Sequence, residues 1–503
     1  MIKKKRYLNI LVYIITAFFA SSSLIGCSAD SNVTNSQSDS SLQTESSLQN
    51  GINTQEGTET EVQPETTNDT LDTETPITLT VYGPSIFSDS GETGAINAVT
   101  GETTMGYEVI VERFQELHPN VTLNIEPIGW TDWRAAIQAA VLGGGIDVIC
   151  HGGLIPILCE PLQPYFDADP DFASSLYNIP AYNTDEMEGS LLNVPTVTSV
   201  PHTLSPGFMI LDKQIFDHYG VSIPDESWTW DTVVTLAESL TGTDPITGEQ
   251  TYGFLMPQTG GTGMIKNHLL TASAYDAKVI EYGETAKDST VNFETDAVRR
   301  DFQTIADLAK FCSPDNTEGV ETALTIQENN QAAMSWVENV VSTIQNINTL
   351  GLQDRFLVLP LPIIEEGEYA GNPSLYLGDG NFAISKDSEH KDWAWEFIKF
   401  MLTDEVAIEY TISNGGILNT ADGLSGIKEV VGDEYTELIM DVLEELPSDY
   451  NSTTNAYYDN VNFGAMGSYL SSELREMIKG NITVDQAIEN TQKAVDDYFS
   501  TLE

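Results

Sequence analysis

Along most of the chain from Ile77 onwards, apolar residues either alternate with polar ones, which predicts strands, or recur three and four positions apart, which predicts helices. The predicted strands cover residues 77–82, 121–126, 146–150, 207–211, 332–336 and 355–362. The predicted helices cover residues 107–119, 133–145, 229–240, 295–311, 392–402, 464–478 and 483–502. The alternation of strand and helix indicates an α/β sheet with right-handed crossovers.

The first 27 residues have the layout of a secretory signal. A basic cluster at residues 3–6 precedes an apolar segment at residues 8–20 and a run of mostly small residues before Cys27. An uncleaved membrane anchor is the alternative, because the apolar stretch could nearly span a bilayer. The polar residues Asn9 and Thr16 within the apolar segment favour cleavage.

Residues 28–76 contain mainly Ser, Thr, Asn, Gln and Glu, and no Lys or Arg occurs between Tyr7 and Glu112. A segment of this composition cannot bury enough apolar area to offset the loss of chain entropy. We therefore predict a disordered tether between the N-terminus and the folded part.

The charge of the chain limits its partners. The 503 residues include 21 Lys and Arg against 76 Asp and Glu, a formal net charge of −55 at pH 7. A nucleic-acid backbone or an anionic membrane surface would be repelled by most of such a surface. We therefore expect no nucleic-acid partner.

Three cysteines remain besides Cys27, namely Cys150, Cys159 and Cys312. An odd number gives no complete disulfide framework. A bridge between Cys150 and Cys159 outside the cell and a set of buried free thiols are both open alternatives.

No motif of catalytic machinery emerges from the sequence. The chain has no Gly-Lys pair and hence no Walker A loop, no H-E-x-x-H motif among its six histidines, and no G-x-S-x-G elbow. Residues 378–383 match G-x-G-x-x-A, but the residues behind them alternate like a strand, so this match is accidental. Among 76 acidic residues, pairs of carboxylates arise by chance. We therefore assign no catalytic residue, no metal ligand and no cofactor.

Aromatic residues near strand ends and helix starts form the most informative pattern. They are Trp130, Trp133, Trp228, Trp230, Trp336 and the aromatic residues of 457–464. Rings beside amide and carboxylate groups suit a sugar, whose C–H faces stack on aromatic rings while its hydroxyls form hydrogen bonds. Core packing explains each ring equally well when it is taken alone. The Trp-Thr-Trp of residues 228–230 is interpreted as structural, with Thr229 as the cap of the following helix.

Five stretches of the chain carry a family resemblance. They are residues 109–149, 191–233, 328–339, 378–405 and 413–420. In this order they resemble motifs of the family 1 extracellular solute-binding proteins; residues 378–405, for example, are similar to the pattern GGxxxAIxKxSKHKEAAWEFIKFLTSxE. Near the N-terminus, residues 24–27 resemble the lipobox of bacterial lipoproteins, in which a peptidase cleaves before a cysteine that carries a diacylglycerol.

The resemblance implies a two-lobed periplasmic-binding-protein fold of the α/β class (type II, Venus-flytrap) with hinge crossovers, preceded by the disordered tether. The implied parts are a signal peptide at 1–26, the lipidated cysteine and linker at 27–76, a first lobe of 77–196 plus 313–373, and a second lobe of 197–312 plus 374–503. The implied crossings lie near residues 194–198, 312–322 and 373–378. Such lobes close on a solute between them.

The resemblance also implies which residues contact the solute. They are Ser85, Asp89, His151, Trp336, Glu338, Asn339, Gly378, Asp379, Tyr457, Tyr458 and Phe463. His151 stands where maltodextrin-binding relatives have an aromatic residue at the cleft, and Trp336 lies in the segment that supplies a stacking ring. Residues 199–203 contain no acid where some relatives have one, so the resemblance does not imply a maltodextrin ligand.

We therefore expect a monomeric binding protein, anchored through lipid on Cys27 to the extracellular face of the membrane of a Gram-positive-type cell. It would capture a sugar, an oligosaccharide in particular, and deliver it to the permease subunits of an ABC importer without catalysing a reaction. A secreted glycan-active enzyme, a binding protein for a non-sugar solute and a static surface scaffold are the alternatives.

Overall fold

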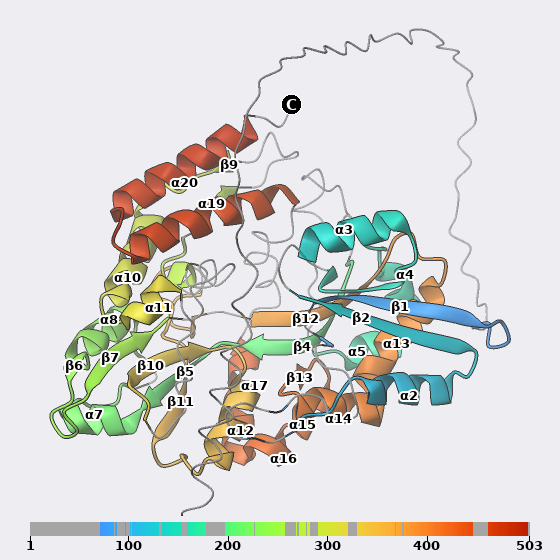
Figure 1. Ribbon diagram of the computed structural model, residues 1–503, viewed down its shortest axis with the longest axis horizontal. Coiled ribbons are helices and arrows are strands. Elements are labelled where there is room, and N and C mark those ends of the chain that lie inside the picture. The colour runs from blue at the N-terminus through green and yellow to red at the C-terminus, as the bar shows by residue number, and fades with distance from the viewer. Residues whose placement is uncertain are drawn as a thin grey trace, which may run out of the picture. The chain divides into compact units, whose positions relative to one another are not determined.

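The computed structural model describes most of the chain between Leu71 and Ser500. The residues outside its described part are 1–70, 85, 88–95, 97–100, 102, 130–132, 153–157, 178–196, 226, 257–267, 269–270, 278, 282–289, 320–328, 368, 375–376, 446–460 and 501–503. The predicted signal segment, Cys27 and most of the predicted tether lie outside the described residues. The described part contains two main sheets with their helices (Figure 1).

The last residues of the predicted tether belong to the fold. Leu71 packs against the core of the first sheet. The Asn120 side chain donates hydrogen bonds to the carbonyl oxygens of Asp72 and Thr75, both at 3.2 Å. The described fold thus begins at Leu71, earlier than the predicted start at Ile77.

The first sheet has six strands in the order β13-β4-β12-β3-β1-β2. They span Ile77–Pro84 (β1), Val121–Ile128 (β2), Val148–Cys150 (β3), Val200–Pro206 (β4), Leu377–Ile384 (β12) and Ile417–Leu418 (β13). β1 pairs in parallel with β2 and β3, whereas β12 pairs antiparallel with β3 and β4. The alternation of apolar residues predicts β1, β2 and β3 correctly, but it does not predict β4. Because residues 378–383 lie in β12, the rejection of the dinucleotide motif is confirmed.

Helices pack on both faces of the first sheet. They span Glu108–Leu117 (α2), Trp133–Gly143 (α3), Gln163–Ala168 (α4), Pro170–Ser175 (α5), Lys391–Thr403 (α13) and Glu405–Ser413 (α14). Side chains of α2, α13 and α14 share one core with Leu79, Val81 and Val148. Ile137 of α3 shares the opposite core with Ile149. Successive residues of β3 thus enter different cores, because side chains alternate across a pleated strand.

Two of the cysteines lie in different cores. Cys150 belongs to the core that α2, α13 and α14 cover, and Cys159 belongs to the core under α3. Both thiols and that of Cys312 are free and buried, and burial raises the pKa of each thiol. Of the two open alternatives, the structure has the free thiols.

A buried carboxylate connects three parts of the first sheet. Asp147, just before β3, accepts hydrogen bonds from the Thr80 N–H at 2.8 Å and from the Ser388 hydroxyl at 2.6 Å. Its carbonyl oxygen accepts the N–H of Ser385 at 2.9 Å. A buried carboxylate is tolerated only with such partners. Asp147 therefore holds β1, the start of β3 and the segment between β12 and α13 together.

The second sheet has five strands in the order β11-β5-β10-β7-β6. They span Phe208–Asp212 (β5), Gly242–Thr243 (β6), Gln250–Leu255 (β7), Ala332–Val337 (β10) and Phe356–Pro360 (β11), and a separate pair is formed by Ile280–Glu281 (β8) and Thr290–Val291 (β9). β5 pairs antiparallel with β10 and β11, and β10 pairs in parallel with β7.

The helices of the second sheet enclose the largest core. They span Lys213–Tyr219 (α7), Trp230–Ser239 (α8), Asp296–Ala309 (α10), Pro314–Glu318 (α11), Val340–Thr349 (α12), Val461–Ile478 (α19) and Val484–Phe499 (α20). Side chains of α8, α10, α19 and α20 pack together with Met209, Phe254 and Met334 of the strands. The predicted cap of α8 is confirmed, because the Thr229 hydroxyl accepts the N–H of Thr232 at 3.2 Å.

Strand pairing corrects the predicted lobe boundaries. Residues 313–373 contain β10 and β11, which were assigned to the first lobe but pair with β5 in the second sheet. Residues 374–503 contain β12, which was assigned to the second lobe but pairs with β3 and β4 in the first sheet. The chain therefore crosses at Gly207, between β4 and β5, again between β11 and β12, and a third time between β13 of the first sheet and α19, which packs in the core of the second.

A third core joins the two sheets. It contains Leu204 of the first sheet and Phe208 of the second, together with side chains of α12 and of the helices that follow β13. These helices span Ala421–Gly426 (α15), Lys428–Val431 (α16) and Asp433–Glu445 (α17). The turn between α14 and β13 lies against α12 so closely that a Cβ on Gly415 would lie 1.7 Å from the Ser342 hydroxyl oxygen.

Gly253 of β7 provides a test of the packing in the core of the second sheet. A Cβ at this position would lie 2.0 Å from the carbonyl oxygen of Ala237 and 2.3 Å from its Cα. Because these backbone atoms cannot rotate away, we expect Gly253→Ala to lower the free energy of unfolding by about 3 kcal/mol, measured by urea denaturation. Gly129→Ala is the control, since no atom lies within 4 Å of its Cβ position. Equal losses of stability in both variants would contradict this packing.

Candidate functional site

In the first sheet, β1 lies between two strands that run parallel to it. β2 pairs on one side of β1 and β3 on the other, so the connections after these parallel strands diverge at one edge of the sheet. Ligands of open α/β sheets bind outside the carboxyl ends of the strands at such a switch point. The candidate site is therefore the edge at which the chain leaves β1 after Pro84 and β3 after Cys150.

Of the predicted contacts that the structure describes, His151 lies at this edge, directly after β3. Its backbone has φ +57°, a left-handed conformation that is uncommon for residues other than glycine. Its N–H donates to the Asn381 carbonyl of β12 at 2.7 Å. A Cβ on Gly152 would lie 2.3 Å from the Ala383 Cβ, so the turn lies directly on β12. His151 is thus held in a fixed position, with 6% of its surface exposed.

A second histidine lies behind His151. His202 of β4 is 2% exposed, its Nε2 atom lies 3.1 Å from the Thr411 hydroxyl, and its ring lies 5.1 Å from that of Phe382. Burial lowers the pKa of His202 to about 3, and the neighbouring His151 acts in the same direction. His202 is therefore neutral at physiological pH. The sequence draws attention to residues 199–203 only for their lack of an acid, and it does not identify His202.

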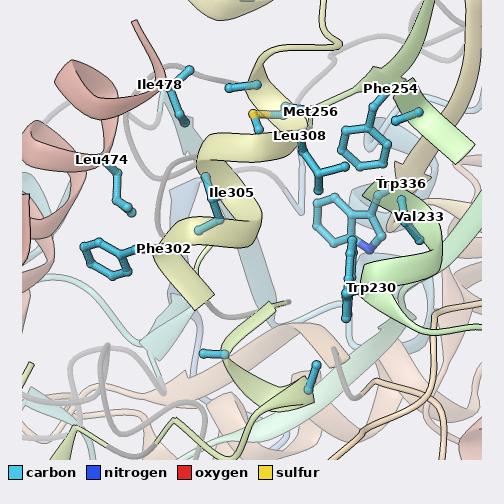
Figure 2. Close-up of a cluster of buried hydrophobic side chains, with 14 of the residues drawn as sticks. Trp230, Val233, Phe254, Met256, Phe302, Ile305, Leu308, Trp336, Leu474 and Ile478 are labelled. Atoms are coloured by element: carbon cyan, nitrogen blue, oxygen red, sulfur yellow. The ribbon is translucent and has the colours of Figure 1, made fainter. Parts of the chain in front are cut away.

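Trp336, the predicted stacking ring, lies in the core of the second sheet. Figure 2 shows it among Trp230, Val233 and Phe254, and it is 6% exposed. Unlike His151, which follows the end of a strand, Trp336 lies within β10, and its ring belongs to the core that α8 and β7 share. The structure thus supports the alternative of core packing for Trp336. Trp228 and Trp230 are buried as well, which confirms their structural interpretation.

The residues that follow Trp336 in β10 are more accessible. Glu338 is half-buried and Asn339 is exposed. Asn339 directly precedes α12, and its carbonyl oxygen accepts the N–H of Thr343 at 3.0 Å. The two side chains therefore lie at the carboxyl end of β10 in the second sheet.

The other predicted contacts are only partly described. Gly378 and Asp379 lie in β12, where their backbones pair with Ser205 and Leu204 of β4. Phe463 belongs to α19, but its side chain lies outside the described part. Ser85, Asp89, Tyr457 and Tyr458 also lie outside the described residues.

A groove of about 640 Å³ lies elsewhere, between α8 and α10 of the second sheet. Its lining includes Arg299 and Arg300, and none of the predicted contacts. Arg300 forms ion pairs with Glu365 at 2.6 Å and Glu366 at 2.7 Å, so its charge is already neutralised. Within the described residues, no group of three or more His, Cys, Asp or Glu side chains could hold a metal ion.

Residues 100–408 match the sequence model of the bacterial extracellular solute-binding proteins. Because this match covers more than half of the chain, the protein belongs to that family. Among the helices in the part of the chain that the structure describes, none is long and apolar enough to cross a bilayer.

Solved structures share the fold at low sequence identity. A sugar transporter from Rhizobium etli in an open conformation has 20% identity and a TM-score of 0.56, over 84% of this chain and 99% of that chain. A solute-binding protein from Agrobacterium radiobacter in complex with ribitol has 14% identity and a TM-score of 0.62, over 85% and 98%. An ABC substrate-binding protein from Listeria monocytogenes in complex with cycloalternan has 16% identity and a TM-score of 0.59, over 84% and 99%. The predicted two-lobed fold is confirmed.

The buried His202 predicts a loss of stability in acid. In the unfolded chain a histidine has a pKa of about 6.5, whereas burial lowers the pKa of His202 to about 3 in the fold. Between these values only the unfolded chain binds the proton, so the free energy of unfolding falls as the pH drops below about 6.5. The contribution of one such group approaches about 1.4 kcal/mol per pH unit.

We expect His202→Gln to show a shallower decline than the wild type between pH 6.5 and 5, measured by urea denaturation at each pH. Each protein serves as its own reference, because the comparison uses the slope and not the absolute stability. Parallel slopes would show that His202 is protonated to the same extent in the folded and unfolded states.

Proposed function

We propose that this protein captures a sugar, an oligosaccharide in particular, and delivers it to an ABC importer. The match of residues 100–408 to the extracellular solute-binding family carries the proposal. The solute would bind between the lobes, at the edge that carries His151 in the first and near Glu338 and Asn339 in the second. The strand pairing supports lobes divided at Gly207 and between β11 and β12.

Three features support a sugar as the solute. Structures of the same fold hold ribitol and cycloalternan. The neutral His202 behind His151 adds no charge to this edge, which suits an uncharged solute that binds through hydrogen bonds. The net charge of −55 disfavours an anionic solute by long-range repulsion.

Capture would act through the equilibrium between open and closed lobes. A solute stabilises the closed state only by its higher affinity for that state. Three chain crossings and the shared third core would serve as the hinge. The closed form would then present both lobes to the permease subunits, while the importer hydrolyses ATP.

A panel of solutes tests the sugar ligand. The panel contains maltose, maltotriose, cellobiose, xylobiose and raffinose, with spermidine and glycerol 3-phosphate as charged non-sugars. A sugar at 100 times its Kd should stabilise the fold by about 2.7 kcal/mol, which raises the Tm by several degrees. We expect His151→Ala to weaken the binding of that sugar about tenfold in isothermal titration calorimetry, because a hydrogen bond at a held position is lost. Arg299→Ala, in the groove between α8 and α10, is the control that should leave the affinity unchanged.

The same panel separates the alternatives. A Tm shift with spermidine or glycerol 3-phosphate alone would contradict a sugar ligand. Release of sugar products over many turnovers would identify an enzyme. A bound sugar that leaves the small-angle scattering curve unchanged would favour a static scaffold over a closing hinge.

We also propose that a diacylglycerol on Cys27 anchors the protein. Two acyl chains contribute roughly 0.8 kcal/mol per buried CH₂ group, which suffices for stable attachment. In a Gram-positive host, the wild type should sediment with the membrane and incorporate labelled palmitate, whereas Cys27→Ser should do neither. Ser28→Ala is the matched control and should behave as the wild type. Membrane retention of Cys27→Ser without label would favour the uncleaved apolar segment as the anchor.

A further inference from the structure

The peptide bond that joins Cys150 to His151 is held between two strands of the first sheet. On one side, the His151 N–H donates to the Asn381 carbonyl of β12 at 2.7 Å. On the other side, Gly83 of β1 lies so close that a Cβ there would lie 2.7 Å from the Cys150 carbonyl oxygen. The backbone that enters His151 is therefore fixed by both neighbours of β3.

The next residue, Gly152, is held by two side chains. A Cβ on Gly152 would lie 2.3 Å from the Ala383 Cβ of β12. The Cys159 thiol donates to the Gly152 carbonyl at 3.3 Å. Cys159 is attached to the same strand, because it forms an antiparallel bridge with Ser385 directly after β12. We call Ala383 and Cys159 the seat of Gly152.

The backbone of His151 requires such support on both sides. Its φ of +57° lies in the left-handed region, which residues with a side chain disfavour. A residue keeps this conformation only where the surrounding contacts impose it. Because the direction of a side chain depends on its backbone, the contacts of Gly152 help to determine where the His151 ring lies.

The Cys159 thiol is able to donate because it stays protonated. Burial raises the pKa of this thiol above its usual value, and the hydrogen-bond donor of a cysteine is its S–H group. The thiol is free, so its proton is not lost to a disulfide. The contact with Gly152 therefore depends on a reduced cysteine at this position.

We propose that Ala383 and Cys159 are positioning residues for solute capture, an inference that rests on the proposed function. Both side chains are buried, and they act through His151. They hold its backbone in the left-handed conformation before the solute arrives, so that less conformational entropy is lost on binding. A change in either residue then weakens binding without removing a contact of the solute.

A matched pair of cysteine variants tests the thiol contact. Cys159→Ala should weaken the tightest-binding sugar of the panel about threefold in isothermal titration calorimetry, the effect of one weak hydrogen bond. Cys159→Ser keeps a donor and should restore the affinity. Cys312→Ala is the control, because the Cys312 thiol is also buried and donates to the Leu308 carbonyl at 3.4 Å, in the core of the second sheet. It should lower the Tm to a similar extent and leave the affinity unchanged.

A matched pair of alanine variants tests the seat from the side of β12. Ala383→Val adds two methyl groups where Gly152 lies against the strand, and we expect it to weaken the same sugar about tenfold because Gly152 is displaced. Ala333→Val adds the same groups to a buried alanine of β10 in the core of the second sheet. It should lose stability through overpacking but keep the wild-type affinity.

A double-mutant cycle separates positioning from general stability. If Cys159 and Ala383 act through His151, neither Cys159→Ala nor Ala383→Val should weaken the sugar further in a His151→Ala background. A further loss in that background, or an equal loss of affinity in Cys159→Ala and Cys312→Ala, would overturn the positioning role. Unchanged affinity in His151→Ala itself would do the same.

A measurement without ligand keeps the seat testable if the proposed function fails. The ring signal of His151 in a ¹H–¹³C NMR spectrum, assigned by its loss in His151→Ala, should shift in Cys159→Ala and Ala383→Val but not in Cys312→Ala. A signal that stays in place would overturn the seat. A shift in a protein that binds no sugar of the panel would support the seat and contradict the sugar ligand.

Discussion

The antiparallel pairing of β4 with β12 is the interaction on which the rest of the structure depends. Both strands lie in the first sheet, but β4 continues through Gly207 into the second sheet and β12 returns from it. Their register shifts at Gly380, whose N–H donates to the Thr203 hydroxyl at 3.1 Å and whose Cβ would lie 2.6 Å from that oxygen. The next residue, Asn381, accepts the N–H of His151. One strand pair therefore sets both the passage between the sheets and the position of a candidate contact.

The elements that the sequence predicts well are those whose apolar residues recur at a regular spacing within a short window. The strand β1 and the helix α10 are examples, since each buries a single face that is visible in a short window. β4 escapes prediction because Pro201 and Pro206 interrupt its pattern, and proline argues against a strand inside a sheet. The lobe boundaries were wrong because β12 pairs with β3, which lies more than 200 residues earlier. The pattern of apolar and polar residues within a short window does not show which distant strand a strand pairs with.

For the candidate site, too, the sequence shows what depends on local pattern and not what depends on contacts between distant residues. The position of Trp336 at a strand end is visible in the sequence, but the direction of its ring depends on α8, which packs on that face of the sheet. That His151 follows the strand β3 can be predicted from the sequence, whereas its left-handed backbone accompanies contacts of the turn with Asn381 and Ala383. The neutral state of His202 follows from burial beneath α14, which only the folded arrangement produces.

The direction of β1 determines how the molecule can be attached to a surface. The chain enters β1 at Leu71 to Ile77, and the candidate edge lies at the opposite end of the strand. Eight residues at roughly 3.3 Å each separate the two by about 26 Å. A biosensor surface coupled directly before Leu71 would thus attach to the end of β1 that is farthest from this edge. The polarity of a single strand is a practical guide for immobilising the protein.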